Sequence, residues 1–334
     1  MVESLEKQYV VGIDVGGQTT KIGVVDARGQ VLAQTVIRSD NYDEPEPYLD
    51  EVAAAVKKVV EEANVSGKVR GVGIGAPNGN YYTGMVEMAP NVVWARTTAV
   101  PVAKMLSTRL NGIPVALTND ANAAAVGEMT YGAARGMKNF IMITLGTGVG
   151  SGIVINGEVV YGHDGFAGEL GHVIMKRNNG RICGCGRTGC LETYASATGV
   201  ARTAREFLEA RANEPSTLRS MDVDSITSKD VYDAAVAGDK LAKDVFDFTG
   251  NILGEALADF ITFSSPEAIV LFGGLAKSGD LLMRPLKESM DRNTMTVFKG
   301  KVKLLLSELK ESDAAVLGAS ALGWEAKAAA DIKK

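Results

Sequence analysis

Short apolar runs alternate along the chain with amphipathic stretches, which is the pattern of an α/β protein. The apolar runs predict buried strands over 9–14, 21–25, 31–37, 69–75, 114–118, 140–145, 151–155, 268–272 and 302–306. Elsewhere apolar residues recur at helical spacing between charged ones, which predicts helices. These helices cover 48–63, 101–110, 193–210, 228–237, 239–263, 281–293 and 313–330, and an alanine-rich one begins beside Asp120. The polar stretch 209–224 is expected to be an irregular loop on the surface.

Both halves of the chain begin with the same device, a strand, a glycine turn and a second strand. The first turn covers 15–20 and the second covers 146–150. The tip of such a hairpin can present backbone N–H groups to a phosphate. One Gly-Gly turn is a weak signal, because most such turns only reverse the chain. Its repetition indicates an internal duplication, as in the actin-like ATPase fold, with ATP expected between two domains.

Polar residues follow the ends of several predicted strands, where α/β proteins place ligand contacts. Asn119 and Asp120 come directly after one strand, and either residue could instead be the cap of the next helix. Gly273 and Gly274 follow another strand and are expected to lead into a helix, as an adenosine or phosphate contact or as a plain turn. Asn91, after a proline, is by itself ordinary turn chemistry.

All three cysteines of the chain lie in one glycine-rich segment, at Cys183, Cys185 and Cys190, and His172 lies a short way upstream. Three thiols and an imidazole are the ligand set of a closed, tetrahedral structural zinc site. Ordinary buried thiols would have no reason to gather in one turn. A disulfide is disfavoured by the odd number of cysteines and by the lack of an apolar leader.

Composition limits the classes of function. The chain has 334 residues, enough for two domains with separate cores. Its net charge of −5 does not favour binding to the negatively charged backbone of nucleic acid. No run is long enough to span a bilayer, and the start has no apolar signal segment. We therefore expect a cytoplasmic protein that binds neither nucleic acid nor membranes.

Two motifs carry a family resemblance. The Gly-Glu-Leu-Gly-His segment at 168–172 and the Cys-Gly-Cys-Gly-x-x-Gly-Cys-Leu-Glu segment at 183–192 resemble the signature of the ROK family of sugar kinases. The resemblance extends from residue 12 to about residue 323. It implies a two-domain actin-like (ribonuclease H-like) fold with a structural zinc loop. The domains would be 1–117, completed by the helix 313–330, and 118–312, with a boundary near Leu117.

The resemblance also implies ATP-dependent phosphorylation of a hexose, with glucose as the expected substrate and its 6-hydroxyl as the acceptor. Asp120 would be the general base. The sugar contacts would be Asn91, Asn119, Asp120, Glu169, His172 and Glu192. The positions for ATP and Mg²⁺ would be Asp14, Gly16, Gly17, Thr19, Lys21, Gly146, Thr147, Gly148, Gly273 and Gly274. The ligands of a structural Zn²⁺ would be His172, Cys183, Cys185 and Cys190.

One position departs from the family pattern. Gln18 stands where the family usually has threonine directly after the first Gly-Gly pair, so the hydroxyl of Thr19 or Thr20 is left to reach a phosphate. Asp14 would orient the Mg²⁺ shell, or it is only a strand-end turn residue.

Several alternatives stay open within the resemblance. The substrate could be an N-acetylhexosamine, fructose or mannose, or the protein could bind sugar without catalysis. A sugar-responsive repressor of the family would need a helix-turn-helix region ahead of the first strand, where we expect none. Like other family members, the protein is expected to form a homo-oligomer, either a dimer or a tetramer.

Overall fold

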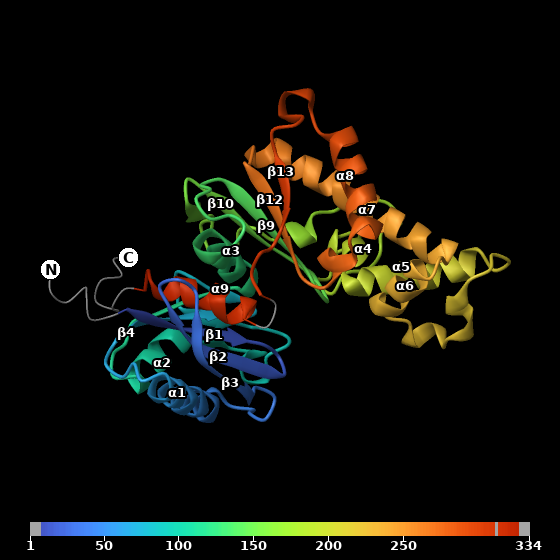
Figure 1. Cartoon of the computed structure of the whole chain (residues 1–334). Helices are drawn as coiled ribbons and strands as arrows, with labels where there is room; N and C mark the ends of the chain where they lie inside the picture. The colour runs from blue at the N-terminus through green and yellow to red at the C-terminus, as the bar shows by residue number, and fades with distance from the viewer. Residues whose placement is uncertain (1–7, 311–312, 327–334) are drawn as a thin grey trace. The chain divides into compact units, whose positions relative to one another are not determined.

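The computed structural model describes residues 8–310 and 313–326 and divides into two compact units (Figure 1). Unit 1 is formed by 1–138, 152–168 and 307–334, within which the described residues lie, and unit 2 by 139–151 and 169–306. The first segment of unit 1 extends past Leu117 and includes the helix that begins at Asp120. Within the described ranges, no helix is both long and apolar enough to cross a bilayer.

Unit 1 is built on a five-stranded mixed sheet. Its order is β3 (Val31–Arg38), β2 (Thr19–Asp26), β1 (Tyr9–Val15), β4 (Val69–Gly75) and β8 (Val115–Thr118). The first three strands pair antiparallel, whereas β1, β4 and β8 run parallel. Helices α1 (Pro45–Glu62) and α2 (Val102–Arg109) pack on one face, and α3 (Asp120–Tyr131) and α9 (Ala314–Gly323) on the other (Figure 1). A small second sheet contains β5 (Gly79–Asn80), β6 (Met85–Glu87) and β7 (Ala99–Val100), and the 3-10 turn η2 (Val93–Ala95) lies between β6 and β7 in the sequence.

The closing helix α9 lies unusually near the sheet because the strands beneath it carry glycine. Gly12 and Gly73 are partners in the register of β1 and β4. A Cβ at Gly73 would collide with the carbonyl oxygen of Ala319 in α9. A glycine at this position therefore lets the helix backbone rest directly on the sheet.

Most of the second sheet lies in unit 2. The strand order is β11 (Glu158–Val159), β10 (Val149–Ile155), β9 (Phe140–Leu145), β12 (Ala268–Phe272) and β13 (Lys303–Leu306). Strand β10 continues into residues of unit 1, where β11 pairs with it. Strands β9, β12 and β13 are parallel. This order repeats that of unit 1, with β9 and β10 in the places of β1 and β2, so the predicted duplication is visible in the topology.

The helices of unit 2 pack around one large apolar core. They are α4 (Glu192–Ala195), α5 (Ala197–Ala210), α6 (Ser228–Val236), α7 (Lys240–Ser264) and α8 (Asp280–Asn293). Short 3-10 turns connect them, at η3 (Leu170–His172), η4 (Thr217–Ser220), η5 (Val223–Ser225), η6 (Leu275–Ser278) and η7 (Thr296–Phe298).

The expected helices differ from the structure in three places. The helix expected over 193–210 is divided at Ser196, which ends α4 and caps α5 by accepting a hydrogen bond of 3.0 Å from the backbone N–H of Gly199. After Gly274 the chain forms only a 3-10 turn before Gly279, at φ +58°, starts α8. Of the helix expected over 313–330, the structure has 314–323, and residues 327–330 lie outside the described residues.

Candidate active site and metal centre

In unit 1 the first glycine turn brings a carboxylate and an ammonium group together. Asp14 at the end of β1 pairs in register with Lys21 on β2. Burial raises the pKa of Asp14 to about 6, the negative charge of Asp120 adds to the shift, and Lys21 opposes it. Asp14 and Asp120 are therefore electrostatically coupled, although they are far apart in sequence.

The turn itself is tighter than expected, because β2 already begins at Thr19. The backbone N–H of Gly16 donates to the carbonyl of Thr19 at 2.9 Å. A Cβ at Gly17 would come within 2.5 Å of the carbonyl oxygen of Asn91, so the turn and the predicted sugar contact at Asn91 lie side by side.

Of the two hydroxyls after Gln18, one belongs to the core. The Thr20 side chain is fully buried, with its hydroxyl 2.8 Å from Ser39 Oγ and 2.7 Å from the Tyr48 hydroxyl. Thr19 is half-buried and is the hydroxyl that can face a ligand. Gln18 is exposed at the tip, and its carbonyl accepts a hydrogen bond of 2.9 Å from the Ser39 backbone.

The structure separates the roles of Asn119 and Asp120. Asn119 is the N-cap of α3, because its side-chain oxygen accepts a hydrogen bond of 2.7 Å from the backbone N–H of Asn122. Asp120 is the first helical residue, with an exposed side chain that accepts only a local bond of 2.9 Å from Ala121 N–H among those described. Desolvation by the surrounding protein raises the pKa of Asp120, and hydrogen bonds from the backbone at Ala121 and at Asp120 itself oppose this shift. The carboxylate of Asp120 is thus open to solvent and is not needed as the cap.

In unit 2 the four predicted zinc ligands come together. Their ligand atoms all lie within 4.8 Å of one another. His172 Nδ1 is 3.6 Å from Cys183 Sγ, and the sulfurs of Cys185 and Cys190 are 3.7 Å apart. A tetrahedral zinc ion with Zn–S of about 2.3 Å and Zn–N of about 2.0–2.1 Å places its ligand atoms roughly 3.6–3.8 Å apart. The two distances of 3.6 and 3.7 Å therefore fit this ion.

Local structure explains how the thiols converge. Antiparallel bridges join Ile174 to Cys190 and Ile182 to Thr188, which folds 183–190 into a small hairpin. Burial raises the pKa of the Cys183 thiol to about 12 without a metal. A bound cation must therefore displace a proton from this thiol, as metal binding to cysteine generally requires.

Two of the predicted sugar-binding side chains, Glu169 and Glu192, lie beside this cluster, and a third, His172, is part of it. While Nδ1 of His172 faces Cys183, its Nε2 lies 3.9 Å from Glu169 Oε2. One ring nitrogen is thus available to a metal and the other to a substrate. Glu192 Oε2 accepts a hydrogen bond of 3.0 Å from the backbone N–H of Val149, and its Oε1 lies 3.7 Å from Cys183 Sγ. A Cβ at Gly148 would collide with the Glu192 carboxylate, so the second glycine turn lies directly against the side chain of Glu192.

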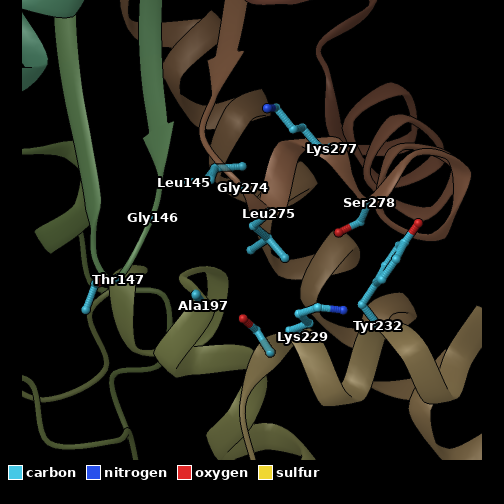
Figure 2. A pocket seen from close by; sticks show the side chains of 11 residues that line it. Leu145, Gly146, Thr147, Ala197, Lys229, Tyr232, Gly274, Leu275, Lys277 and Ser278 are labelled. Atoms are coloured by element: carbon cyan, nitrogen blue, oxygen red, sulfur yellow. The ribbon is translucent and has the colours of Figure 1, made fainter. Parts of the chain in front are cut away.

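The second glycine turn also borders a cavity of about 520 Å³ in unit 2 (Figure 2). Gly146, Thr147 and Gly274 line it as the sequence predicts, but Gly273 does not. With φ +106°, Gly273 packs against the backbone of Leu145 instead. The other lining residues are Leu145, Ala197, Ser228, Lys229, Tyr232, Leu275, Lys277 and Ser278.

The sequence did not predict that α6 forms one side of this cavity. Figure 2 shows Lys229 and Tyr232 extending from that helix, across from the turn at Gly146. The amphipathic pattern of 228–236 predicts a helix but not which residues it turns toward the distant Gly274. The sequence itself contains no signal for this contact.

Comparison with known proteins agrees with the geometry. The chain matches the model of the ROK family over residues 10–326. It is 36% identical over 325 residues to a glucokinase of Halalkalibacterium halodurans, covering 97% of this chain and 96% of that protein. It is 33% identical over 324 residues to a glucokinase of Thermotoga maritima, covering 95% and 98%.

A solved structure supports the same assignment. The ROK family glucokinase of Streptomyces griseus in complex with glucose and AMPPNP superposes with a TM-score of 0.76 at 33% identity, covering 95% of this chain and 99% of that one. The fold is that of the ROK sugar kinases, and the shared strand order of the two sheets is consistent with a two-domain actin-like kinase. The chain belongs to the ROK family.

Proposed function

We propose that this protein transfers the terminal phosphoryl group of ATP to the 6-hydroxyl of glucose. The observation that carries the proposal is Asp120, whose carboxylate is open to solvent and is not needed as the cap of its helix. A sugar hydroxyl is a weak nucleophile near neutral pH. A carboxylate that accepts its proton as the new P–O bond forms contributes about 10²- to 10⁴-fold to the rate. A raised pKa makes Asp120 a better proton acceptor than an ordinary aspartate.

The sugar would be held by side chains with fixed directions. Glu169 and the Nε2 atom of His172 lie together, and Glu192 is fixed by its hydrogen bond to Val149. Asn91 and the amide nitrogen of Asn119 would complete the set. A site built from such groups discriminates against analogues that lack a hydroxyl, because its polar atoms would then lose their partners.

The nucleotide would use the cavity of unit 2 and the two glycine turns. The aromatic ring of Tyr232 and the apolar side chain of Leu275 suit a nucleoside. Backbone N–H groups at the turns suit phosphate oxygens. Asp14 is a hard oxygen ligand suited to the shell of Mg²⁺, which neutralises phosphate charge when it is bound.

The metal cluster would have a structural role. Four protein ligands leave no open position on a tetrahedral zinc ion, so it would not contact a substrate. The expected effect of the ion is to fix the ring of His172 and the chain that leads to Glu192.

The proposal is tested by measuring ADP release from Mg-ATP with glucose, mannose, fructose, N-acetylglucosamine and N-acetylmannosamine. We expect the highest kcat/KM with glucose. Preference for an N-acetyl sugar, mannose or fructose would leave the proposed mechanism intact but contradict the assignment of glucose as the substrate. If the protein binds sugar but turns over none of these sugars, it is a non-catalytic sugar-binding protein. The replacement of the usual threonine by Gln18 would then be the first candidate cause.

We also propose that the protein forms a homo-oligomer, either a dimer or a tetramer. Light scattering coupled to size-exclusion chromatography measures the molar mass directly, and a monomer at micromolar concentration would contradict it.

A further inference from the structure

The hairpin that carries the cysteines is anchored at its base by a buried cation that the proposed mechanism does not use. Arg181 is 6% exposed, although charged side chains are almost never buried unless they are paired. Its backbone also joins both ends of the hairpin. The Arg181 N–H donates to the Tyr194 hydroxyl at 3.0 Å, and the Arg181 carbonyl accepts a hydrogen bond of 2.8 Å from Gly189 N–H.

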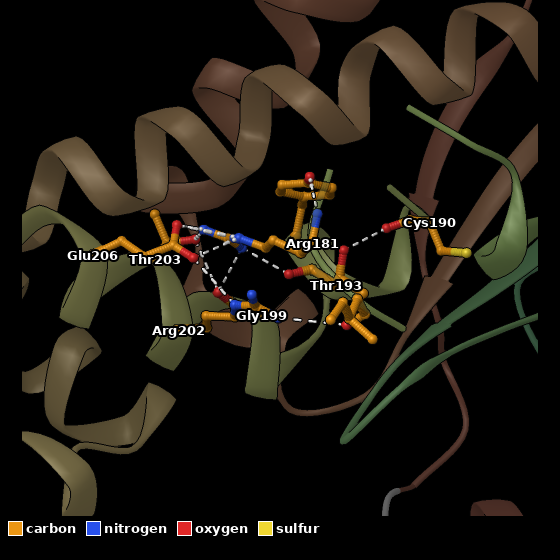
Figure 3. A network of polar contacts seen from close by, with 9 residues as sticks. Arg181, Cys190, Thr193, Gly199, Arg202, Thr203 and Glu206 are labelled. Atoms are coloured by element: carbon orange, nitrogen blue, oxygen red, sulfur yellow. Dashed lines mark hydrogen bonds and ion pairs between the residues drawn. The ribbon is translucent and has the colours of Figure 1, made fainter. Parts of the chain in front are cut away.

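The Arg181 guanidinium is the centre of a polar network (Figure 3). Its Nε donates to Glu206 Oε1 at 3.1 Å, and its Nη2 donates to Thr203 Oγ1 at 2.9 Å and to Glu206. Its Nη1 donates to the carbonyl of Thr193 at 2.7 Å. The guanidinium also lies 4.5 Å from the centre of the Tyr194 ring. Every nitrogen of the guanidinium therefore has a partner, which is the condition for a stable buried arginine.

The bond to Thr193 links this network to the sugar-binding groups. Thr193 directly follows Glu192, and its hydroxyl donates to the carbonyl of the metal ligand Cys190 at 2.8 Å. Glu192 in turn accepts the hydrogen bond from Val149 in the second glycine turn. Arg181 thus supports the short segment 190–193 through the Thr193 carbonyl, while the Glu192 carboxylate is bonded separately to Val149.

We propose that Arg181 is a positioning residue for sugar binding, which acts through Thr193 to hold Glu192 in place. None of the hydrogen bonds described for its guanidinium goes to a residue assigned to the sugar or to the metal. This inference rests on the proposed function, because it assigns Glu192 to the sugar. Lysine cannot replace arginine here, because a single ammonium group cannot reach Thr193, Thr203 and Glu206 at once.

The test compares Arg181→Lys with a matched control, Arg202→Lys. Arg202 also bonds to Glu206, at 3.1 Å, but its side chain is 43% exposed, and its described bonds go to Glu206 and to the Ile182 carbonyl. Both changes keep the charge. We expect Arg181→Lys to raise the KM and the Kd for glucose about 10- to 100-fold, the usual effect of losing an outer-shell partner. The KM for ATP, kcat and the zinc content should stay within about twofold, and Arg202→Lys should leave all of these values near those of the wild type.

Other outcomes would contradict either the positioning role of Arg181 or the proposed function. An unchanged glucose Kd in folded Arg181→Lys, or an equal loss of kcat, ATP binding and zinc, would overturn the positioning role. If Arg181→Lys does not fold, Glu206→Gln removes the charged partner while retaining the guanidinium, and it should raise the glucose Kd in the same direction; no change would overturn the inference. A wild type that binds glucose in calorimetry but turns over no sugar would contradict the proposed function alone, because the Kd ratio still decides the role of Arg181.

Discussion

Asp14 and Asp120 are two carboxylates of unit 1, and the negative charge of Asp120 repels that of Asp14 and raises its pKa. Their placement at strand ends could be predicted from the sequence, because the apolar runs before them end there. Their pKa values could not, since the shift of Asp14 depends on burial and on the charge of a residue that folding brings near. The sequence also left open which of Asn119 and Asp120 caps α3, because both types can cap and only the backbone geometry decides.

Asp14→Asn should make the protein more stable at neutral pH and less active. Folding raises the pKa of Asp14 from 3.8 to about 6, so the native state binds more protons than the unfolded state between these values. Stability is therefore lost as pH rises through this window, and the loss is complete above it. The variant lacks this penalty and should gain on the order of 1–3 kcal/mol at pH 8, with the gain shrinking toward pH 4. Urea unfolding of both proteins across this range measures it, and a gain independent of pH would refute the assignment.

At the scale of elements, loops of unit 2 that carry predicted site residues are held to one another by contacts of the Glu192 side chain. In unit 2 the second glycine turn, the hairpin 183–190 and the start of α4 meet at Glu192. The sequence predicted that His172, Cys183, Cys185 and Cys190 gather at one place, and the structure brings these four possible ligands together. It could not predict Val149 as the partner of Glu192 or Arg181 as the anchor of the hairpin, because neither residue type nor spacing marks a backbone N–H or a single arginine as special.

Gly148→Ala should weaken sugar binding more than nucleotide binding. The added methyl group would collide with the Glu192 carboxylate and break its hydrogen bond to Val149, so the KM for glucose should rise about tenfold. Gly146→Ala places its methyl group beside the cavity instead and should mainly raise the KM for ATP. Steady-state kinetics with each substrate varied in turn separates the two effects; equal changes in both variants would count against this division.

Cys185→Ser should lower metal content and sugar affinity together. Cys185 is the exposed member of the cluster, so the substitution removes one ligand with little loss of core packing. Without the ion, the ring of His172 and the chain to Glu192 lose their common support. Metal analysis and glucose calorimetry on the same sample check this, and full activity in a zinc-free Cys185→Ser protein would contradict the structural role.

At the scale of the whole molecule, two sheets with one strand order indicate an old duplication. The repeated strand, glycine turn and strand in the sequence predicted this architecture. The membership of the units was harder to predict, because unit 1 takes up segments from three parts of the chain. The side chains of α6 that line the cavity could not be found for the same reason, since their neighbours at Gly146 and Gly274 are distant in sequence.

Gly73→Ala and Gly73→Val should destabilise the protein in increasing order. Any side chain there pushes α9 away from the sheet of unit 1, and overpacking of this kind costs about 1–3 kcal/mol. The free energy of unfolding in urea measures the cost. Stability equal to that of the wild type in both variants would show that α9 does not rest on the sheet as described.

The central claim is that Asp120 is the general base of a glucose kinase, and the most direct measurement is kcat for Asp120→Asn with glucose and Mg-ATP, beside the glucose Kd of the same protein. Asparagine keeps the size and polarity of the side chain but cannot accept the proton. We predict that kcat falls about 10²- to 10⁴-fold while the glucose Kd changes little. A kcat within about threefold of the wild-type value would contradict the account.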